Sequence, residues 1–318
     1  MIDFYVLLGK ILLFVALAVP GFVMGKLGKI SDKATDTITN ILTDIGMPFL
    51  VLAKLLETDM RSIGITDVLC ASILPAVVVP LLFFGTLLIF GKKDGEREKI
   101  AANRYSAVFS NCGFLGIPLA VAAFPNSPKI AVFVSLFNVI STFLLLTLGV
   151  YILSGDTRHI NPLKAIMKPI TAAVILGMVL SFTGVASKLT AVHEYSSYLA
   201  SITTPMSMTV LGFELSKMKL KKLILTPSLY VVSFIKLIAA PLIALVILIG
   251  LRAVGVNIGE ELAVAMFIAT AVATPATTPA MASRYGADTS LATVHTVGTT
   301  LLCVATLPLV SLIFGVFF

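Results

Sequence analysis

Two apolar segments, Phe109–Phe124 and Ile268–Ser283, each lie inside a hydrophobic stretch long enough to cross a bilayer. Both contain residues that interrupt a helix, namely Gly113, Gly116 and Pro118 in the first and Pro275 and Pro279 in the second. Backbone unwound at membrane depth leaves N–H and C=O groups without helical partners, which is costly unless protein or a watery cavity surrounds the gap. A pair of breaks in corresponding positions of two halves is typical of the substrate site of a secondary transporter.

Polar side chains accompany both breaks. Asn111 leads the first break, and its amide offers donors and an acceptor that suit a small anion. The N-terminal ends of the half-helices would add positive dipole ends aimed at the gap. The alternative is that Asn111 only satisfies backbone groups freed by Pro118. The second break supplies hydroxyls that either bind substrate or bond back to helix carbonyls; these are Thr270, Thr274, Thr277 and Thr278.

Lys236 lies in the middle of the apolar stretch YVVSFIKLIAAP, too deep to reach the membrane surface easily. An intramembrane charge is expensive and marks a candidate functional site. As an ammonium it could pair with a carboxylate substrate or with an acidic residue such as Asp44. The alternative is a structural lysine that neutralises Asp44 or bonds the carbonyls freed near Pro241.

Three further polar residues lie within apolar stretches and are candidates for ion or proton coupling. Asp44 is the one carboxylate well inside an expected span, where it could carry a proton or a cation. His295 could titrate near neutral pH, although a lone membrane histidine is more often a hydrogen-bonded structural group. Asn138 adds an amide in the fifth expected span.

The composition is that of a polytopic membrane protein. The chain has 318 residues, of which 58% are hydrophobic and 12% charged, and its mean hydropathy is +1.04; soluble domains carry about 25% charged residues. The net charge of +7 therefore does not argue for nucleic acid. Three scattered apolar cysteines, Cys70, Cys112 and Cys303, argue against disulfides or a zinc site. Walker-A, HExxH and GxSxG motifs are absent from the sequence, so no cofactor, metal or enzymatic activity is expected.

Ten membrane spans are expected from hydropathy, with no cleavable signal peptide. They are Phe4–Met24, Thr37–Leu56, Val68–Phe90, Ala101–Phe124, Ile130–Leu153, Leu163–Phe182, Tyr195–Leu215, Leu223–Leu251, Glu261–Ala282 and Thr289–Phe317. One alternating set of loops holds most of the lysines and arginines, and the positive-inside rule places that set in the cytoplasm. Both termini are therefore predicted to be extracytoplasmic, in a multi-pass protein of the inner (plasma) membrane.

A weak internal repeat divides the chain into halves at about 1–155 and 160–318. Pro80 and Pro241 are separated by the same number of residues as Pro118 and Pro279, and each pair lies in corresponding spans. Because five spans form each half, the halves must have opposite orientations. We expect an all-α membrane protein with ten transmembrane helices as a five-plus-five inverted repeat, forming a single transport domain with broken helices four and nine.

Three motifs carry a resemblance to a known family: SNCGFLGIPL at Ser110–Leu119, PATTPAMASRYGAD at Pro275–Asp288 and LTDIGMPFLVL at Leu42–Leu52. Together they resemble the auxin efflux carrier family, whose plant members are the PIN proteins and whose bacterial members include malonate and malate permeases. The resemblance implies a scaffold of spans one, two, six and seven. It also implies a transport core that moves like an elevator, with helices four and nine crossing at their prolines, as in the bile-acid-symporter and antiporter superfamily.

The same resemblance assigns roles to individual residues. It makes Asn111 the substrate-binding asparagine and matches Pro118 and Pro275 to the crossing prolines, with Pro279 an equally good match for the second. The plant proteins have a glutamine where this chain has Ala276, which favours a carboxylate smaller than auxin. The resemblance also implies a homodimer.

The sequence therefore predicts a secondary transporter of small organic anions, mono- or dicarboxylates such as malonate or malate, that works in the lipid bilayer. One alternative is a sodium- or proton-coupled symporter or antiporter, which Asp44 and His295 keep open. Another is a non-transporting membrane sensor that binds a ligand, although a soluble output domain is not evident.

Overall fold

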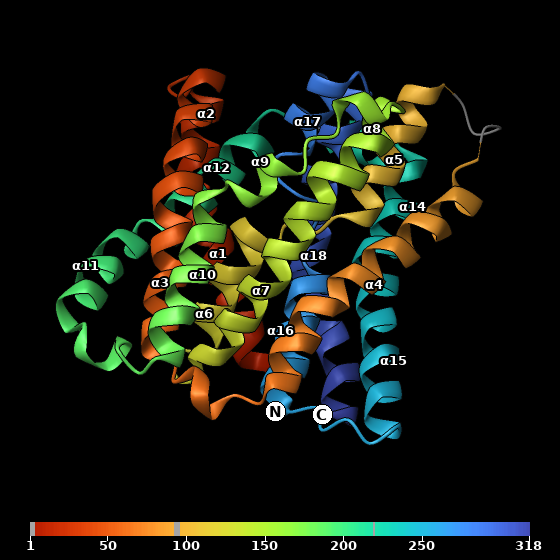
Figure 1. Cartoon of the computed structure of the whole chain (residues 1–318). Helices are drawn as coiled ribbons and strands as arrows, with labels where there is room; N and C mark the ends of the chain where they lie inside the picture. The colour runs from red at the N-terminus through yellow and green to blue at the C-terminus, as the bar shows by residue number, and fades with distance from the viewer. Residues whose placement is uncertain (1–3, 92–95, 219) are drawn as a thin grey trace.

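The computed structural model describes residues 4–91, 96–218 and 220–318, and these residues form helices and connections without any strand. The helices of the first half are α1 (Phe4–Lys26), α2 (Asp32–Ile41), α3 (Met47–Glu57), α4 (Ile65–Ile89), α5 (Arg97–Val108), α6 (Ile117–Ala123), α7 (Pro128–Leu144) and α8 (Val150–Ser154). Those of the second half are α9 (Leu163–Ile166), α10 (Pro169–Phe182), α11 (Thr190–Ser201), α12 (Thr203–Ser216), α13 (Leu220–Ile224), α14 (Pro227–Phe234), α15 (Ala240–Ala253), α16 (Glu260–Ala271), α17 (Thr278–Tyr285) and α18 (Thr289–Phe317). Figure 1 shows them as a bundle.

Seven helical runs in the described chain are long and apolar enough to cross a membrane. They are α1, α2–α3, α4, α5–α6, α7–α8, α14–α15 and α18. The other three expected spans are divided or short: α10 is a single apolar helix of 14 residues, α11 and α12 meet at Ile202, and α16 and α17 are separate helices. A membrane helical protein is confirmed, and the count of ten remains a prediction.

Wide π turns join several of these helices into longer runs, although the α5–α6 run also contains the non-helical residues 109–111. Four such turns are present in the described residues, at Leu42–Gly46, Cys112–Gly116, Leu145–Gly149 and Ile235–Ala239. Three of them end two residues before a proline, at Pro48, Pro118 and Pro241. A proline lacks an N–H and its ring excludes the carbonyl four residues earlier, so a wider turn accommodates it without ending the helix. One of these turns carries Lys236.

The helices pack into two groups. In one, α1 packs along α12, and α3 packs against α10 and α11; in the other, α7 packs against α4 and α16, and α18 against α5, α14 and α17. The two groups meet where α3 contacts α7 and α1 contacts α6 and α18. The α1–α12 pair is in backbone contact, because a Cβ at Gly212 would lie 1.9 Å from the carbonyl oxygen of Ala18.

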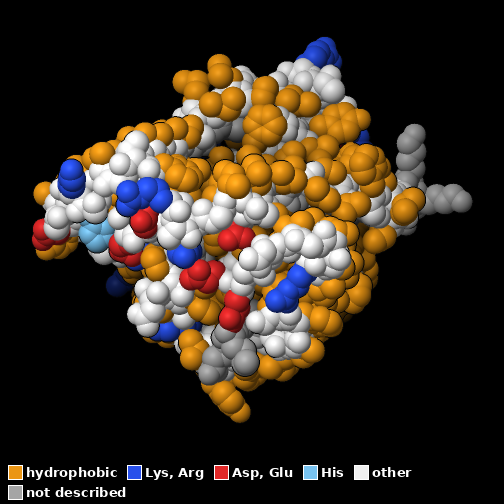
Figure 2. Space-filling view, turned by 60° about the horizontal axis from the view of Figure 1, so that its bottom comes forward, with side chains coloured by type: hydrophobic (Ala, Val, Ile, Leu, Met, Phe, Trp, Pro, Cys, Tyr) orange, Lys and Arg blue, Asp and Glu red, His pale blue; other side chains and the backbone are white. Residues whose placement is uncertain are grey.

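Both termini lie at one end of the bundle, opposite the α1–α2 connection and α17 (Figure 1). Figure 2 is turned toward the end with the termini, and it shows charged side chains gathered on a face that is bordered by hydrophobic ones. Two ion pairs belong to helix starts and connections at this end: Arg61 lies 2.9 Å from Asp59, and Lys129 lies 3.9 Å from Glu261. A polar face between apolar flanks is expected where a bundle leaves the membrane.

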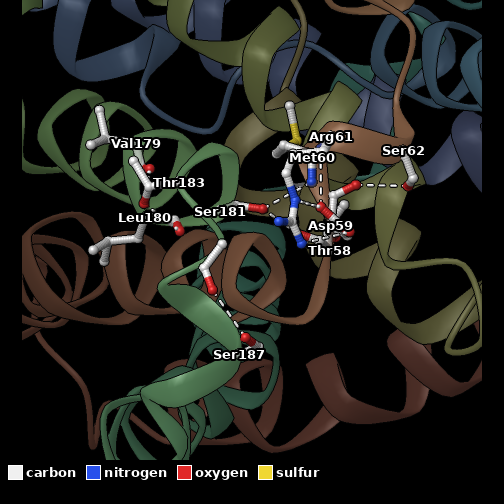
Figure 3. Close-up of polar contacts among 11 residues, drawn as sticks. Thr58, Asp59, Met60, Arg61, Ser62, Val179, Leu180, Ser181, Thr183 and Ser187 are labelled. Atoms are coloured by element: carbon white, nitrogen blue, oxygen red, sulfur yellow. Dashed lines mark hydrogen bonds and ion pairs between the residues drawn. The ribbon is translucent and has the colours of Figure 1, made fainter.

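One buried serine ties the two halves of the chain together near this end. Ser181, on α10, donates its hydroxyl to the carbonyl of Thr58 and accepts the backbone N–H of Met60 at 2.9 Å (Figure 3). The connection that follows α3 is therefore held to α10, which helps to fix the first group of helices as one unit.

Candidate functional site

The two helix breaks predicted from the sequence lie against each other. The first is the extended stretch between α5 and the π turn at Cys112, and the second is the stretch 272–277 between α16 and α17. The backbone N–H of Asn111 donates to the carbonyl of Ala273 at 2.7 Å. Since each break has free backbone groups, each supplies partners that the other lacks.

Thr274 makes two further bonds across the breaks. Its hydroxyl donates to the carbonyl of Ser106 at 2.8 Å, and its backbone N–H donates to the hydroxyl of Thr299, on α18, at 3.1 Å. Ser106 lies in the last turn of α5, where carbonyls have no helical donor. The side chain of Thr274 is fully buried, so this threonine caps the opposite helix rather than its own.

Lys236 reaches the breaks from a third helical run. The residue is 1% exposed, and its Nζ donates to the hydroxyl of Ser110 and to the carbonyl of Thr270, the latter at 2.9 Å. Ser110 belongs to the first break, and Thr270 lies in the last turn of α16. The ammonium therefore joins both broken helices.

One of the alternatives that the sequence left open for Lys236, a pairing with Asp44, is not formed. Asp44 lies on the π turn before Met47 and is exposed, whereas Lys236 is buried. No ion pair within the described residues joins Lys236 to a carboxylate. In the other alternative, Lys236 bonds carbonyls freed near Pro241. The structure does contain a bond from Lys236 to a carbonyl, but that carbonyl belongs to Thr270.

The side chain of Asn111 has an unused donor at the centre of this arrangement. It is 2% exposed, and its Nδ2 finds no hydrogen-bond partner among the residues that the structure describes. Asn138 lies close by, because a Cβ at Gly113 would be 3.4 Å from the Asn138 Oδ1 and 3.5 Å from the sulfur of Met47. Met47 belongs to the other group of helices, so this side of the break faces the boundary between the two groups.

The prolines occupy distinct places around the crossing. Pro118 is the second residue of α6, and Pro279 is the second residue of α17, so the two occupy the same position in their helices. Pro275 lies within the unwound stretch, where its carbonyl accepts the hydroxyl of Thr278 at 2.7 Å. The two broken helices bond each other at Asn111 and Ala273, not at Pro118. Pro118 instead lies in the first turn of α6, where its missing N–H costs nothing.

His295 and Gly116 are two further residues predicted from the sequence, one beside the breaks and one within the first of them. His295 is fully buried on α18, and its Nε2 is 3.2 Å from the hydroxyl of Ser228 on α14. Gly116 closes the π turn, where an added Cβ would be 3.5 Å from the sulfur of Cys112. The backbone N–H of Gly116 donates to the carbonyl of Asn111 at 3.1 Å, so Gly116 belongs to the first break, whereas His295 bonds neither Asn111 nor Lys236 within the described residues.

Three residues of the arrangement are missing from the sequence predictions, and one of them is Ala273, which takes part through its carbonyl. Ser106 takes part through its carbonyl, which no side-chain pattern reveals. Thr299 takes part through its hydroxyl, and a signal for it exists, because Thr296, Thr299 and Thr300 form a polar cluster within the apolar tenth span.

A cavity of about 570 Å³ opens beside the breaks, between α1, α12, α18 and α6. Its walls are apolar except for Lys26 and Thr300, and Leu115 and Leu119 form its side nearest the first break. Asn111 and Lys236 are not part of its lining. The cavity lies at the boundary of the two helix groups.

Comparison with known proteins identifies the family of the chain. A family model described as a membrane transport protein matches residues 6–311, which is nearly the whole chain. The chain is also 30% identical to an uncharacterized transporter of Methanocaldococcus jannaschii over 226 residues, covering 66% of this chain and 70% of that protein.

Proposed function

The chain belongs to the membrane transport protein family, the family of the auxin efflux carriers, and from that membership we propose that it carries small organic anions across a cell's inner membrane. The observation that supports this most directly is the buried amide of Asn111, in the first unwound segment, whose donor has no partner among the described residues. A buried donor without a partner costs about 1–3 kcal/mol. Such a group persists most readily where a ligand completes its hydrogen bonding.

The charge at the breaks favours an anion as that ligand. Lys236 brings one positive charge to the two breaks, and within the described residues no carboxylate is paired with it. A mono- or dicarboxylate that accepts a hydrogen bond from Asn111 would also reduce the cost of burying this charge. The hydroxyls and backbone of the second break, around Thr274 and Thr278, would complete the polar surroundings of the substrate.

The two groups of helices suggest how the substrate crosses. In this proposal the group that contains both breaks moves as the transport core against the group built on α1, α3, α10 and α12. The chain then contains ten spans as an inverted repeat, with both termini outside the cell. The apolar side chains at the boundary of the groups make such sliding feasible, because apolar contacts are not directional.

The test is uptake into proteoliposomes of malonate, malate, an indole carboxylate and a neutral amino acid, each with and without a sodium or pH gradient. We expect saturable uptake of a carboxylate, and loss of that uptake in Asn111→Ala. This variant keeps its backbone N–H and thus its bond to Ala273, so its melting temperature should change little. Asn40→Ala, at an exposed position of α2, is the matched control and should transport normally.

Equal uptake by Asn111→Ala and the unaltered protein would refute the assignment of the site. A carboxylate that raises the melting temperature without ever entering the liposomes would refute transport, and would favour a ligand-binding sensor in its place.

A further inference from the structure

The cavity between α1, α12, α18 and α6 has walls that suit hydrocarbon. It encloses about 570 Å³ at the boundary of the two helix groups, and its described walls are apolar except for Lys26 and Thr300. The hydroxyl of Thr300 donates to the carbonyl of Thr296 at 2.7 Å, so it already has a partner. Cavities lined by apolar side chains exclude water and accept apolar ligands.

The cavity reaches the surface of the molecule that faces the membrane. Met208 and Leu211, which line it from α12, are buried, whereas Val15 and Val19, which line it from α1, are exposed. Leu301, on the α18 side, is exposed as well. Both α1 and α18 are long and apolar enough to cross a membrane, so exposed apolar side chains on them face lipid tails. An acyl chain can therefore enter the cavity sideways from the bilayer.

The length of the cavity suits an acyl chain from one leaflet. The lining follows α1 from Ile11 to Lys26, which is roughly 22 Å of helix. The hydrocarbon of one leaflet is about 15 Å thick, half of the bilayer core. A chain whose headgroup lies beside Lys26 therefore ends inside the cavity.

Lys26 brings a positive charge to one end of the cavity. It lies in the last turn of α1, just before the connection that contains Lys29. Its Nζ is 5.6 Å from the centre of the Phe22 ring, which also lines the cavity. No ion pair joins Lys26 to a carboxylate of the described residues, and no acidic side chain belongs to the described lining. The charge is therefore free to bind an anion where the helix leaves the membrane.

We propose that this cavity binds an anionic phospholipid, with one acyl chain between α1 and α18 and the phosphate beside Lys26. A zwitterionic phospholipid offers the same chain without a net negative charge, so it binds more weakly. The bound lipid contacts α1 and α12 of one helix group and α6 and α18 of the other. The inference does not depend on the proposed transport function, because the site is separate from Asn111 and Lys236 and is tested by binding.

The first test is native mass spectrometry of the purified chain with phosphatidylglycerol or phosphatidylcholine of equal chain length. We expect phosphatidylglycerol to be retained in preference. Lys26→Gln should weaken its binding about fivefold, which corresponds to the attraction of about 1 kcal/mol for one lysine near an anionic membrane surface. Lys33→Gln, at an exposed position outside the lining, is the matched control. Equal retention of the two lipids, or an undiminished preference in Lys26→Gln, would overturn the inference.

A second variant tests the acyl chain and leaves the charge in place. Val304→Trp puts an indole into the cavity and should lose phosphatidylglycerol, whereas Leu302→Trp, at an exposed position of α18 outside the lining, should retain it. Melting temperatures show whether both variants fold. Undiminished binding by a folded Val304→Trp would mean that the headgroup is held without the cavity, which contradicts the proposal. If Val304→Trp does not fold, the comparison with Lys26→Gln still decides.

Competition with water-soluble compounds distinguishes the lipid from other occupants. Glycerophosphoglycerol, which is the headgroup without acyl chains, should not displace phosphatidylglycerol, because the cavity contributes most of the contact. Displacement by it would refute a role for the cavity. Displacement by malonate would show that the cavity belongs to the route of a carboxylate, and would refute the assignment to lipid.

Discussion

Single hydrogen bonds at the breaks connect residues that are far apart in the chain. Thr274 donates its hydroxyl to Ser106, and Asn111 donates its N–H to Ala273. Both acceptors are carbonyls that have no donor within their own helices, because the helices end or unwind at that point. At the scale of the residue, the crossing is therefore a reciprocal exchange of partners between two interrupted helices, and each bond should contribute to stability.

Thr274→Val tests whether the bond from the Thr274 hydroxyl to the carbonyl of Ser106 contributes to stability. The substitution keeps the shape of the side chain and removes the hydroxyl, which leaves the buried carbonyl of Ser106 without its donor. We expect a loss of about 1–3 kcal/mol in the free energy of unfolding, seen as a lower denaturation midpoint in detergent. Thr293→Val is the control, because the exposed hydroxyl of Thr293 bonds only within its own helix. Equal midpoints for the two variants would show that the bond to Ser106 contributes nothing.

At the scale of the element, the closest helix pair depends on the absence of side chains. Besides Gly212, which faces Ala18, a Cβ at Gly21 would lie 2.0 Å from the carbonyl oxygen of Thr209. Small residues let membrane helices approach until their backbones touch. The α1–α12 pair is therefore held closely within one group of helices. This packing supports α1 where it contacts α6 and α18 of the other group.

Gly212→Ala should separate α1 from α12, because its methyl group would meet backbone rather than a side chain that could rotate away. We expect a loss of about 1–3 kcal/mol, as for overpacked cores. Gly250→Ala is the matched control: Gly250 is also helical, but nothing lies within 4 Å of its added Cβ. That control should be neutral or more stable by about 0.4–1 kcal/mol. The measurement is the melting temperature of both variants. A Gly212→Ala protein as stable as Gly250→Ala would contradict the close contact between α1 and α12.

At the scale of the whole molecule, the two ends of the bundle differ in charge. The ends of the chain lie together, and the lysine-rich connection after α1 lies at the opposite end (Figure 1). Basic loops are retained in the cytoplasm. The orientation proposed above therefore makes a prediction for positions that are exposed at each end.

Single cysteines test the orientation in a variant whose three native cysteines are replaced by alanine. Ser187, in the connection before α11, and Asp36, on α2, are both exposed. A membrane-impermeant maleimide should label Ser187→Cys in intact cells and Asp36→Cys only after the membrane is opened. The reverse pattern would show that the termini are cytoplasmic.

The amino-acid sequence alone determined the class of the protein and the location of its breaks. Hydropathy identifies membrane helices because burial in lipid depends on composition. Gly113, Gly116 and Pro275 indicated that helices are interrupted nearby, because their backbone effects are local. The non-helical residues of the first break are 109–111, however, and Gly113 and Gly116 lie in the π turn that follows them. The family followed from motifs around these same residues, and the match over residues 6–311 confirms it.

Only the tertiary structure decided which residues bond each other at the breaks. Asn111 bonds Ala273, Lys236 bonds Ser110 and Thr270, and Asp44 stays exposed. The partners of such bonds come from different helices, and their distances depend on how whole helices pack. A pattern of residue types along the chain does not specify that packing, so a buried lysine could be predicted from the sequence while the oxygens that hold it could not.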